Sequence, residues 1–139
     1  MCYRWSRLMV VAVLCLVVVG CGKGREAASP EAVAKEFVEA LKAGEYAKAS
    51  DLMAWERISE SRNADFSTFA TSQRNLIISK TKEDEQGQLQ AVAARLAGAE
   101  VGPAQVSGES ATVTVQTQSG PATITLRKED KGWGVYSVQ

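Results

Sequence analysis

The fold is decided by residues 111–127, whose sequence is ATVTVQTQSGPATITLR. Apolar and polar side chains alternate in both halves of this stretch, which is typical of strands with one face on a core and the other in water. The halves are separated by Ser119-Gly120-Pro121, a cluster of turn residues. Residues 111–127 therefore predict two neighbouring antiparallel strands.

The strand pattern continues on both sides of this pair. Turn clusters precede and follow it at 107–110 and 129–132, and residues 133–138 form a last strand. A first strand is expected at Val101–Val106, although Pro103 cannot donate a hydrogen bond to a ladder. We therefore expect an antiparallel meander from residue 99 onward, with the Val101–Val106 strand at its edge or starting late.

Two helices are predicted before the strands, beginning at Ser29-Pro30-Glu31. Serine accepts bonds from unpaired amides, proline fits the first helical position and glutamate favours the positive end of the helix dipole. The first helix ends at Gly44, and Glu45 to about Trp55 is expected to form a second that pairs with it as a hairpin. The apolar face of the first helix is formed by Val33, Phe37, Ala40 and Leu41.

The middle of the chain, residues 65–97, predicts one bent helix or two. Asn63 or Asp65 is expected to cap its start, and Leu89–Leu96 repeats with helical spacing before Gly98. We favour a break near Gly87, because glycine costs about 1 kcal/mol inside a helix. The apolar positions of the earlier part are Phe66, Phe69, Ala70, Leu76 and Ile77. Helices followed by strands, without alternation, predict an α+β fold for residues 29–139.

The first 20 residues have the features of a secretory signal peptide. Arg4 and Arg7 precede Leu8–Val19, an apolar run shorter than the roughly 20 residues that span a bilayer. The run ends in Val18-Val19-Gly20-Cys21, which resembles the lipobox of bacterial lipoproteins. The resemblance implies cleavage between Gly20 and Cys21 and acyl chains, such as palmitate, on Cys21. The alternative is a buried free cysteine in an uncleaved anchor.

The cysteine positions agree with lipidation, because Cys2 and Cys15 would leave with the signal peptide. Residues 21–28 then form the lipidated cysteine and a flexible tether. In enteric-type Gram-negative bacteria, Asp after the lipidated cysteine favours retention in the inner membrane, and this chain has Gly22. We therefore expect the periplasmic leaflet of the outer membrane in a Gram-negative cell, or the outer face of the cell membrane in a Gram-positive one.

Composition excludes several classes of function. The 139 residues include 16 basic and 16 acidic side chains, which argues against nucleic acid as a partner. The chain has no histidine, which excludes Ser-His-Asp chemistry and imidazole metal sites. No cofactor is implied. Glu83-Asp84-Glu85 could attract a cation, but consecutive acids point in different directions around a helix, so we expect a solvated face and no metal site.

Residues 29–49 and the last strands resemble small lipoproteins of the nuclear transport factor 2-like superfamily. The matching C-terminal parts are 111–115 and 125–135, the second of which contains Lys131-Gly132-Trp133. The resemblance implies a curved antiparallel sheet wrapped around helices into a cone, which can enclose an apolar pocket. The middle of the fold is variable in the family, and residues 65–98 are where this chain could depart from the family fold.

The resemblance leaves three functions open. We expect a non-catalytic binding or interaction module whose partner is an envelope protein or a small apolar ligand. The second is an isomerase- or dehydratase-like enzyme, for which Tyr46, Tyr136, Asp51, Glu56 or Asp65 could be recruited. The third is a purely structural docking partner with a large exposed apolar patch. The aromatic candidates for a pocket, which could equally be core residues, are Tyr46, Trp55, Phe66, Phe69, Trp133 and Tyr136.

Overall fold

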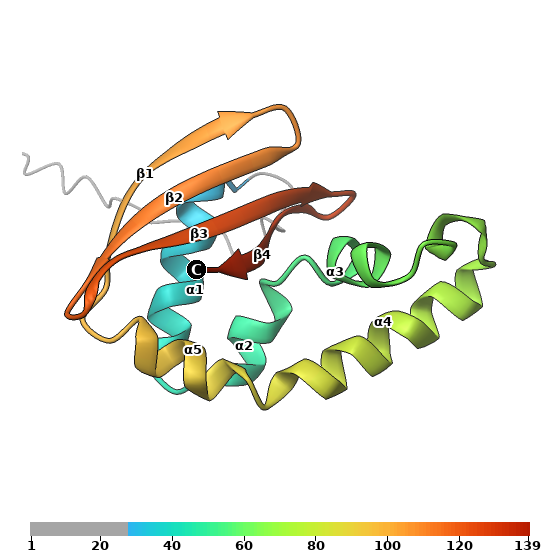
Figure 1. The fold of residues 1–139 in the computed structure, drawn as a ribbon, viewed down its shortest axis with the longest axis horizontal. Coiled ribbons are helices and arrows are strands. Elements are labelled where there is room, and N and C mark those ends of the chain that lie inside the picture. The colour runs from blue at the N-terminus through green and yellow to red at the C-terminus, as the bar shows by residue number, and fades with distance from the viewer. Residues whose placement is uncertain (1–27) are drawn as a thin grey trace, which may run out of the picture.

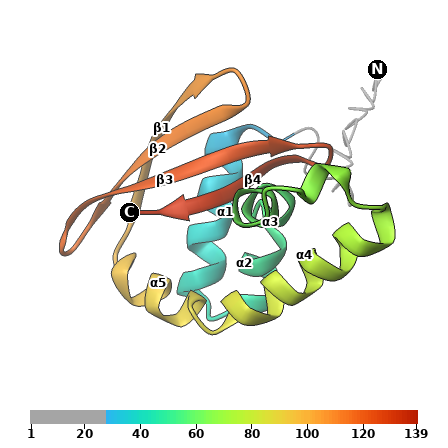
Figure 2. The same ribbon diagram turned by 45° about the vertical axis from the view of Figure 1, so that its right-hand side comes forward.

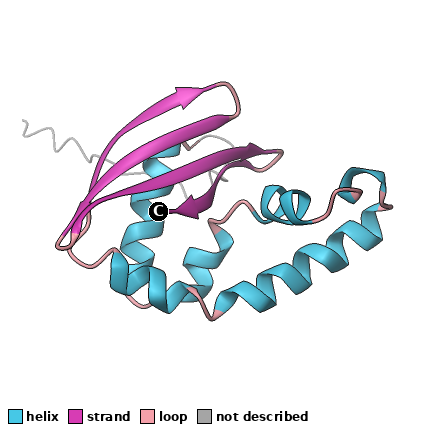
Figure 3. Cartoon of the chain, viewed as in Figure 1, coloured by secondary structure: helices cyan, strands magenta, loops and turns pink. Residues whose placement is uncertain are grey.

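A four-stranded antiparallel sheet with helices packed against it forms the body of the protein (Figure 1). The computed structural model describes residues 28–139. The strands are adjacent in the order in which they occur in the chain, which confirms the predicted meander and the α+β class (Figure 3). Their bounds are β1 Glu100–Ser107, β2 Ser110–Thr117, β3 Gly120–Glu129 and β4 Gly132–Val138.

The register of the sheet confirms the face assignment made from the period of two. Val113 lies opposite Ile124, and both are completely buried, whereas Thr112 and Thr125 form the next pair on the other face. β1 is an edge strand, as expected from Pro103, and its register with β2 shifts between Val101 and Ala104. The proline therefore lies where the ladder is interrupted, because it has no N–H to donate.

The helices precede the sheet in the chain, and the first of them matches the prediction. The Ser29 hydroxyl accepts a hydrogen bond from the Ala32 amide at 3.2 Å, and Gly44 takes a φ of 72°, which favours glycine. The bounds are α1 Pro30–Lys42, α2 Tyr46–Asp51, α3 Trp55–Arg62, the 3₁₀ turn η2 Phe66–Thr68, α4 Thr71–Gln86 and α5 Leu89–Arg95.

The predicted second helix, Glu45 to about Trp55, is wrong in its second half. α2 ends at Asp51, and the chain next to it pairs with β4. The Ala54 amide donates to the Val135 carbonyl at 2.7 Å, and the Val135 amide donates to the Leu52 carbonyl at 2.9 Å. These bonds require extended backbone at Met53, so a new helix, α3, begins at Trp55.

The predicted start of the third helix is also wrong. Phe66 lies in the 3₁₀ turn, and the α-helix begins only at Thr71. The Gln73 side chain caps this start by accepting a hydrogen bond from the Ala70 amide. Asn63 does not cap it, because its side chain donates to the Ser59 carbonyl at 2.8 Å, at the end of α3. Phe66 is 2% exposed, and its side chain is buried from the 3₁₀ turn, where a continuous helix was expected. The predicted break at Gly87 is confirmed, since α4 ends at Gln86 and α5 begins at Leu89.

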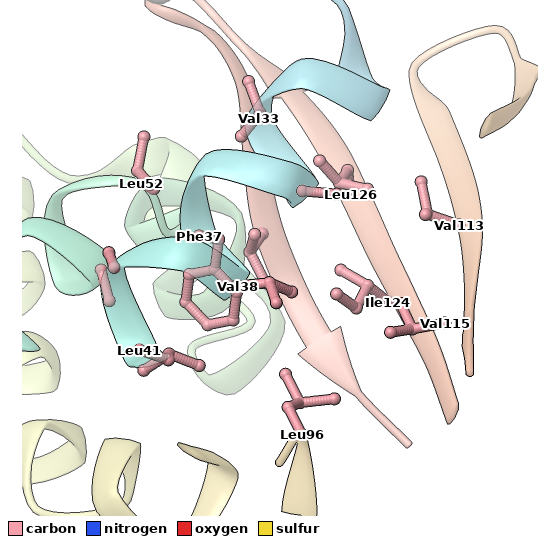
Figure 4. Close-up of a cluster of buried hydrophobic side chains, with 14 of the residues drawn as sticks. Val33, Phe37, Val38, Leu41, Leu52, Leu96, Val113, Val115, Ile124 and Leu126 are labelled. Atoms are coloured by element: carbon pink, nitrogen blue, oxygen red, sulfur yellow. The ribbon is translucent and has the colours of Figure 1, made fainter. Parts of the chain in front are cut away.

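The core lies between α1 and the inner face of the sheet. Figure 4 shows Phe37 and Val38 of α1 in one cluster with side chains of the strands. Burying a side chain of this size contributes about 1.5–3 kcal/mol relative to leaving it exposed. Helix α1 therefore occupies the inner face of the sheet. The other labelled members of the cluster are Val33, Leu41, Leu52, Leu96, Val113, Val115, Ile124 and Leu126.

Helix α4 stands apart from this core. It packs against α3 and, less extensively, against α2. Both views place it at the margin of the molecule, with α3 between it and β4 (Figures 1 and 2). Of residues 65–98, which the family resemblance left variable, α4 thus lies at the margin, whereas Leu89 and Leu96 belong to the core.

Candidate functional site

A groove of about 770 Å³ lies between α3, α4 and the turn that joins β3 to β4. We call it the α4 groove. A smaller hollow of about 240 Å³ adjoins it and shares Glu56, Arg74, Glu129 and Asp130 with it. The α4 groove is lined by Asp51, Met53, Trp55, Glu56, Thr71, Arg74, Asn75, Ile78, Lys82, Glu129, Asp130 and Lys131. Its size is in the range of pockets that hold a small molecule or a short peptide.

Three apolar side chains contribute to the lining of the groove: Met53, Trp55 and Ile78. The pairing of the chain with Val135 places Met53, and the Trp55 indole N–H donates to the Ser50 carbonyl at 2.6 Å. This bond satisfies the polar group of a side chain that is 7% exposed, so the indole is fixed in orientation. Ile78 comes from α4 and is half-buried.

Ion pairs join α4 to the two helices that face it. Lys82 Nζ lies 2.7 Å from Asp51 Oδ1 on α2, and Arg62 of α3 lies 2.8 Å from Glu85. Arg74 Nη1 lies 3.9 Å from Glu56 Oε1, while its Nε atom is buried without a hydrogen-bond partner among the described residues. Both basic side chains that α4 contributes to the groove therefore have an acidic partner on a neighbouring helix, although Arg74 keeps one unsatisfied N–H.

Glu129 positions the beginning of α3. Its Oε1 atom accepts hydrogen bonds from the backbone amides of Glu56 at 2.8 Å and Arg57 at 3.3 Å. The residue at the cap position of α3 is Ala54, whose side chain cannot accept a hydrogen bond. A carboxylate is favourable here because it satisfies open amides at the positive end of the helix dipole.

Arg57 joins α3 to the sheet beside this cap. Its Nε donates to the Lys128 carbonyl at 3.1 Å, and its terminal nitrogens contact Glu60 at 3.0 Å and Glu109 at 3.4 Å. The hydrogen bond that Arg57 donates to Glu60 raises the pKa of Arg57, partial burial opposes that rise, and the charges of Glu60, Glu109 and Glu56 add to it. The guanidinium is a fixed positive charge that holds helix and hairpin together.

The structure does not bring the aromatic pocket candidates around one cavity. Trp55 lines the α4 groove and Phe66 the adjoining hollow. Tyr136 lies under Arg127, whose guanidinium carbon is 5.4 Å from the ring centre, and lines a separate hollow of about 210 Å³. Tyr46 and Trp133 are half-buried against the core, and Phe69 is half-buried between η2 and α4.

The acidic residues considered for catalysis are equally dispersed. Asp51 pairs with Lys82, Glu56 lies near Arg74, and Asp65 is exposed before η2. Glu60 is the carboxylate that shares a hollow with Tyr136, and it is paired with Arg57. The inner face of the sheet, where the cone resemblance implied a pocket, is packed with side chains of α1.

Sequence reasoning missed the side chains of α4 that line the groove, namely Thr71, Arg74, Asn75, Ile78 and Lys82. The groove arises where α4 faces the β3–β4 turn, and these segments are far apart in the chain. No local pattern marks these residues, because the charges of α4 are equally typical of a solvated helix face.

Some of the sequence predictions concern residues that do not line the α4 groove. Gly20 and Cys21 lie outside the described residues. Among the described residues, no group of three or more His, Cys, Asp or Glu side chains is arranged to hold a metal ion. Glu83 and Asp84 are exposed on α4. The helices of residues 28–139 include none that is both long enough and apolar enough to cross a membrane.

Comparison with known proteins gives no relative for this chain: no family model matches it, and neither a curated protein nor a solved structure is similar to it.

Proposed function

We propose that this protein is a cell-envelope lipoprotein whose domain binds a peptide segment of another envelope protein in the α4 groove without catalysing a reaction. The observation that carries the binding part is the groove itself, which combines an apolar patch with charges of both signs. The anchoring part rests on the sequence Val18-Val19-Gly20-Cys21 after a basic start and an apolar run.

The proposed anchor keeps the domain close to the membrane. Residues 21–28 span at most roughly 28 Å when fully extended, since each residue adds about 3.5 Å. Two or three acyl chains on Cys21 attach a protein far more firmly than one chain. The domain would then face the periplasm from the outer membrane of a Gram-negative cell, or the exterior of a Gram-positive cell.

The cone of the nuclear transport factor 2-like superfamily remains our proposal for the fold type. Its support is the helical hairpin α1–α2 that precedes a meander, with α1 on the inner face of the sheet. The packed inner face means that a ligand site in such a cone would lie elsewhere in this chain, and the α4 groove, at about 770 Å³, is larger than the hollows beside Phe66 and Tyr136.

The charges of the groove favour a peptide over other ligands. Asp51, Glu56, Glu129 and Asp130 face Arg74, Lys82 and Lys131, so neither sign dominates. A polyanion such as nucleic acid needs an excess of positive charge, which is absent here. A peptide offers an apolar side chain for Trp55 and Ile78 and also backbone groups and charges for the polar lining.

The test is selection of peptides from a displayed random library on the detergent-solubilised full-length protein. Peptides that share a consensus are expected, and a synthetic consensus peptide should bind at least about tenfold more weakly to Ile78→Arg, which places a cation against the apolar patch. The matched control is Leu76→Arg, the same change on the same helix at a side chain that is 71% exposed and outside the groove.

Binding that is equally strong in both variants would refute the groove as the site. Selection without a consensus, together with saturable binding of a small apolar probe such as a naphthalene dye in the wild type but not in Ile78→Arg, would replace the peptide by a small apolar ligand.

A further inference from the structure

We infer that α4 is a movable wall of the α4 groove, which detaches from α2 and α3 when its ion pairs break. The inference deepens the proposed function, because it supplies the way in which an occupant enters. It concerns the chain alone, however, and can be tested without any ligand.

Helix α4 lacks the apolar face that normally fixes a helix to its protein. Of its 16 residues only Thr81 is buried. Of its consecutive apolar residues Leu76, Ile77 and Ile78, the first is 71% exposed and the other two are only half-buried, so they do not form a buried stripe. In contrast, α1 buries a continuous face from Val33 to Leu41. Most helical stability in proteins comes from such packing, which α4 has only in part.

Charged side chains provide much of the attachment of α4. The pairs Lys82–Asp51, Glu85–Arg62 and Arg74–Glu56 connect it to its neighbours near both ends. The Lys82 and Asp51 side chains are 40% and 70% exposed, so water and salt screen their attraction. The Debye length falls from about 10 Å at 0.1 M salt to about 3 Å at 1 M, which weakens exposed pairs more than buried apolar contacts.

The closed arrangement also leaves a donor unsatisfied. Arg74 Nε is buried without a hydrogen-bond partner among residues 28–139, and its Nη1 is 3.9 Å from Glu56 Oε1, beyond hydrogen-bond distance. When α4 moves away, water or an acceptor on a bound peptide can satisfy this N–H. Opening therefore recovers part of the free energy that the loss of the ion pairs costs.

The two ends of the segment are suited to such a movement. Phe66 and Leu89, each 2% exposed, are fixed in the protein interior before and after α4. Between Leu89 and α4 lies Gly87, around which a Cβ would meet no atom within 4 Å. Rotation of the backbone near Gly87 and near Ala70 would move α4 and leave both buried anchors in place.

The test is hydrogen exchange measured by mass spectrometry on the full-length protein in non-ionic detergent. A detached helix of this length is marginally stable in water, so its amides exchange once it leaves α2 and α3. We expect exchange in α4 to be at least about tenfold faster at 1 M than at 0.1 M sodium chloride, with α1 and β3 unchanged.

A charge swap identifies the contact. Lys82→Glu alone and Asp51→Lys alone are expected to accelerate exchange in α4 at low salt by about tenfold, because each places like charges opposite one another. The double variant restores an attractive pair and should return exchange to within about threefold of wild type. The control Lys80→Glu makes the same change at an exposed side chain of α4 and should have no effect.

Exchange in α4 as slow as in α1 at both salt concentrations would overturn the inference, and so would a double variant that stays open. Neither measurement uses a ligand. If exchange shows that α4 opens but the peptide library yields no binding peptide, only the proposed function is disproved.

Discussion

The Glu129 carboxylate lies 2.8 Å from the backbone nitrogen of Glu56, so a residue of the β3–β4 hairpin caps a helix that begins at Trp55, far away in the chain. The contact fixes one wall of the α4 groove, because both residues line it. A local capping residue would stabilise α3 alone, whereas this one also determines how α3 is placed relative to the sheet.

Replacing Glu129 by alanine should therefore destabilise the protein by about 0.5–2 kcal/mol, as for other lost helix caps. Urea unfolding of the full-length protein in detergent, followed by circular dichroism, measures the change. Glu129→Gln keeps an acceptor oxygen and should lose less. Asp130→Asn, next in the chain and exposed, is the control and should remain within about 0.5 kcal/mol of wild type. Equal effects of the variants at 129 and 130 would contradict the capping role.

Truncating Phe37 should have the largest effect of the single changes considered. The side chain is 1% exposed between α1 and the sheet, and Phe37→Ala is expected to cost about 3–5 kcal/mol. Thr114→Ala, on the solvent-exposed face of β2, should cost less than about 1 kcal/mol. The midpoint of urea unfolding distinguishes the two. If Phe37→Ala does not fold, Phe37→Leu, which removes less volume, provides the comparison.

Two glycines should respond to alanine with opposite signs. Gly44 has a φ of 72°, so Gly44→Ala should destabilise by about 1 kcal/mol. Gly87 has a φ of −65° and open space around its Cβ position, so Gly87→Ala should stabilise by about 0.4–1 kcal/mol. Thermal unfolding of both variants in the same buffer is the measurement. Destabilisation by Gly87→Ala would show that the backbone there needs a conformation open only to glycine.

Changing Cys21 tests the proposed anchor directly. Cys21→Ser removes the thiol to which acyl chains attach, so the protein should leave the membrane fraction or accumulate as an unprocessed precursor. Cys15→Ser, within the apolar run, is the matched control and should be processed normally. Mass spectrometry of the N-terminal peptide reports the outcome. An intact N-terminus with an unmodified Cys21 in the wild type would refute the anchor and the proposed location with it.

The parts of the fold that sequence could predict are those fixed by local patterns. The alternation of apolar and polar residues in 111–127 predicted β2 and β3, and Ser29 and Gly44 predicted the two ends of α1. The errors occurred where distant contacts override local preference. Residues 52–54 continue a helical pattern, but their backbone bonds to Val135 end the helix.

The candidate site was less predictable than the fold. Trp55 was among the expected pocket residues and does line the groove, but nothing local distinguishes Arg74 or Ile78 from other residues of a helix that lacks a continuous apolar face. Glu129 reads as part of a turn, and its role depends on Ala54 lacking an acceptor. Such a site depends on how separate elements meet, which a single sequence does not show.

The pairing of Leu52 and Ala54 with Val135 has a consequence for the self-association of this protein. It blocks the centre of the outer margin of β4, and on the opposite margin Pro103 interrupts β1. Exposed strand margins otherwise allow neighbouring molecules to zip into continuous intermolecular sheets and fibrils. With both margins interrupted, the described sheet offers a neighbouring copy no continuous strand edge to extend.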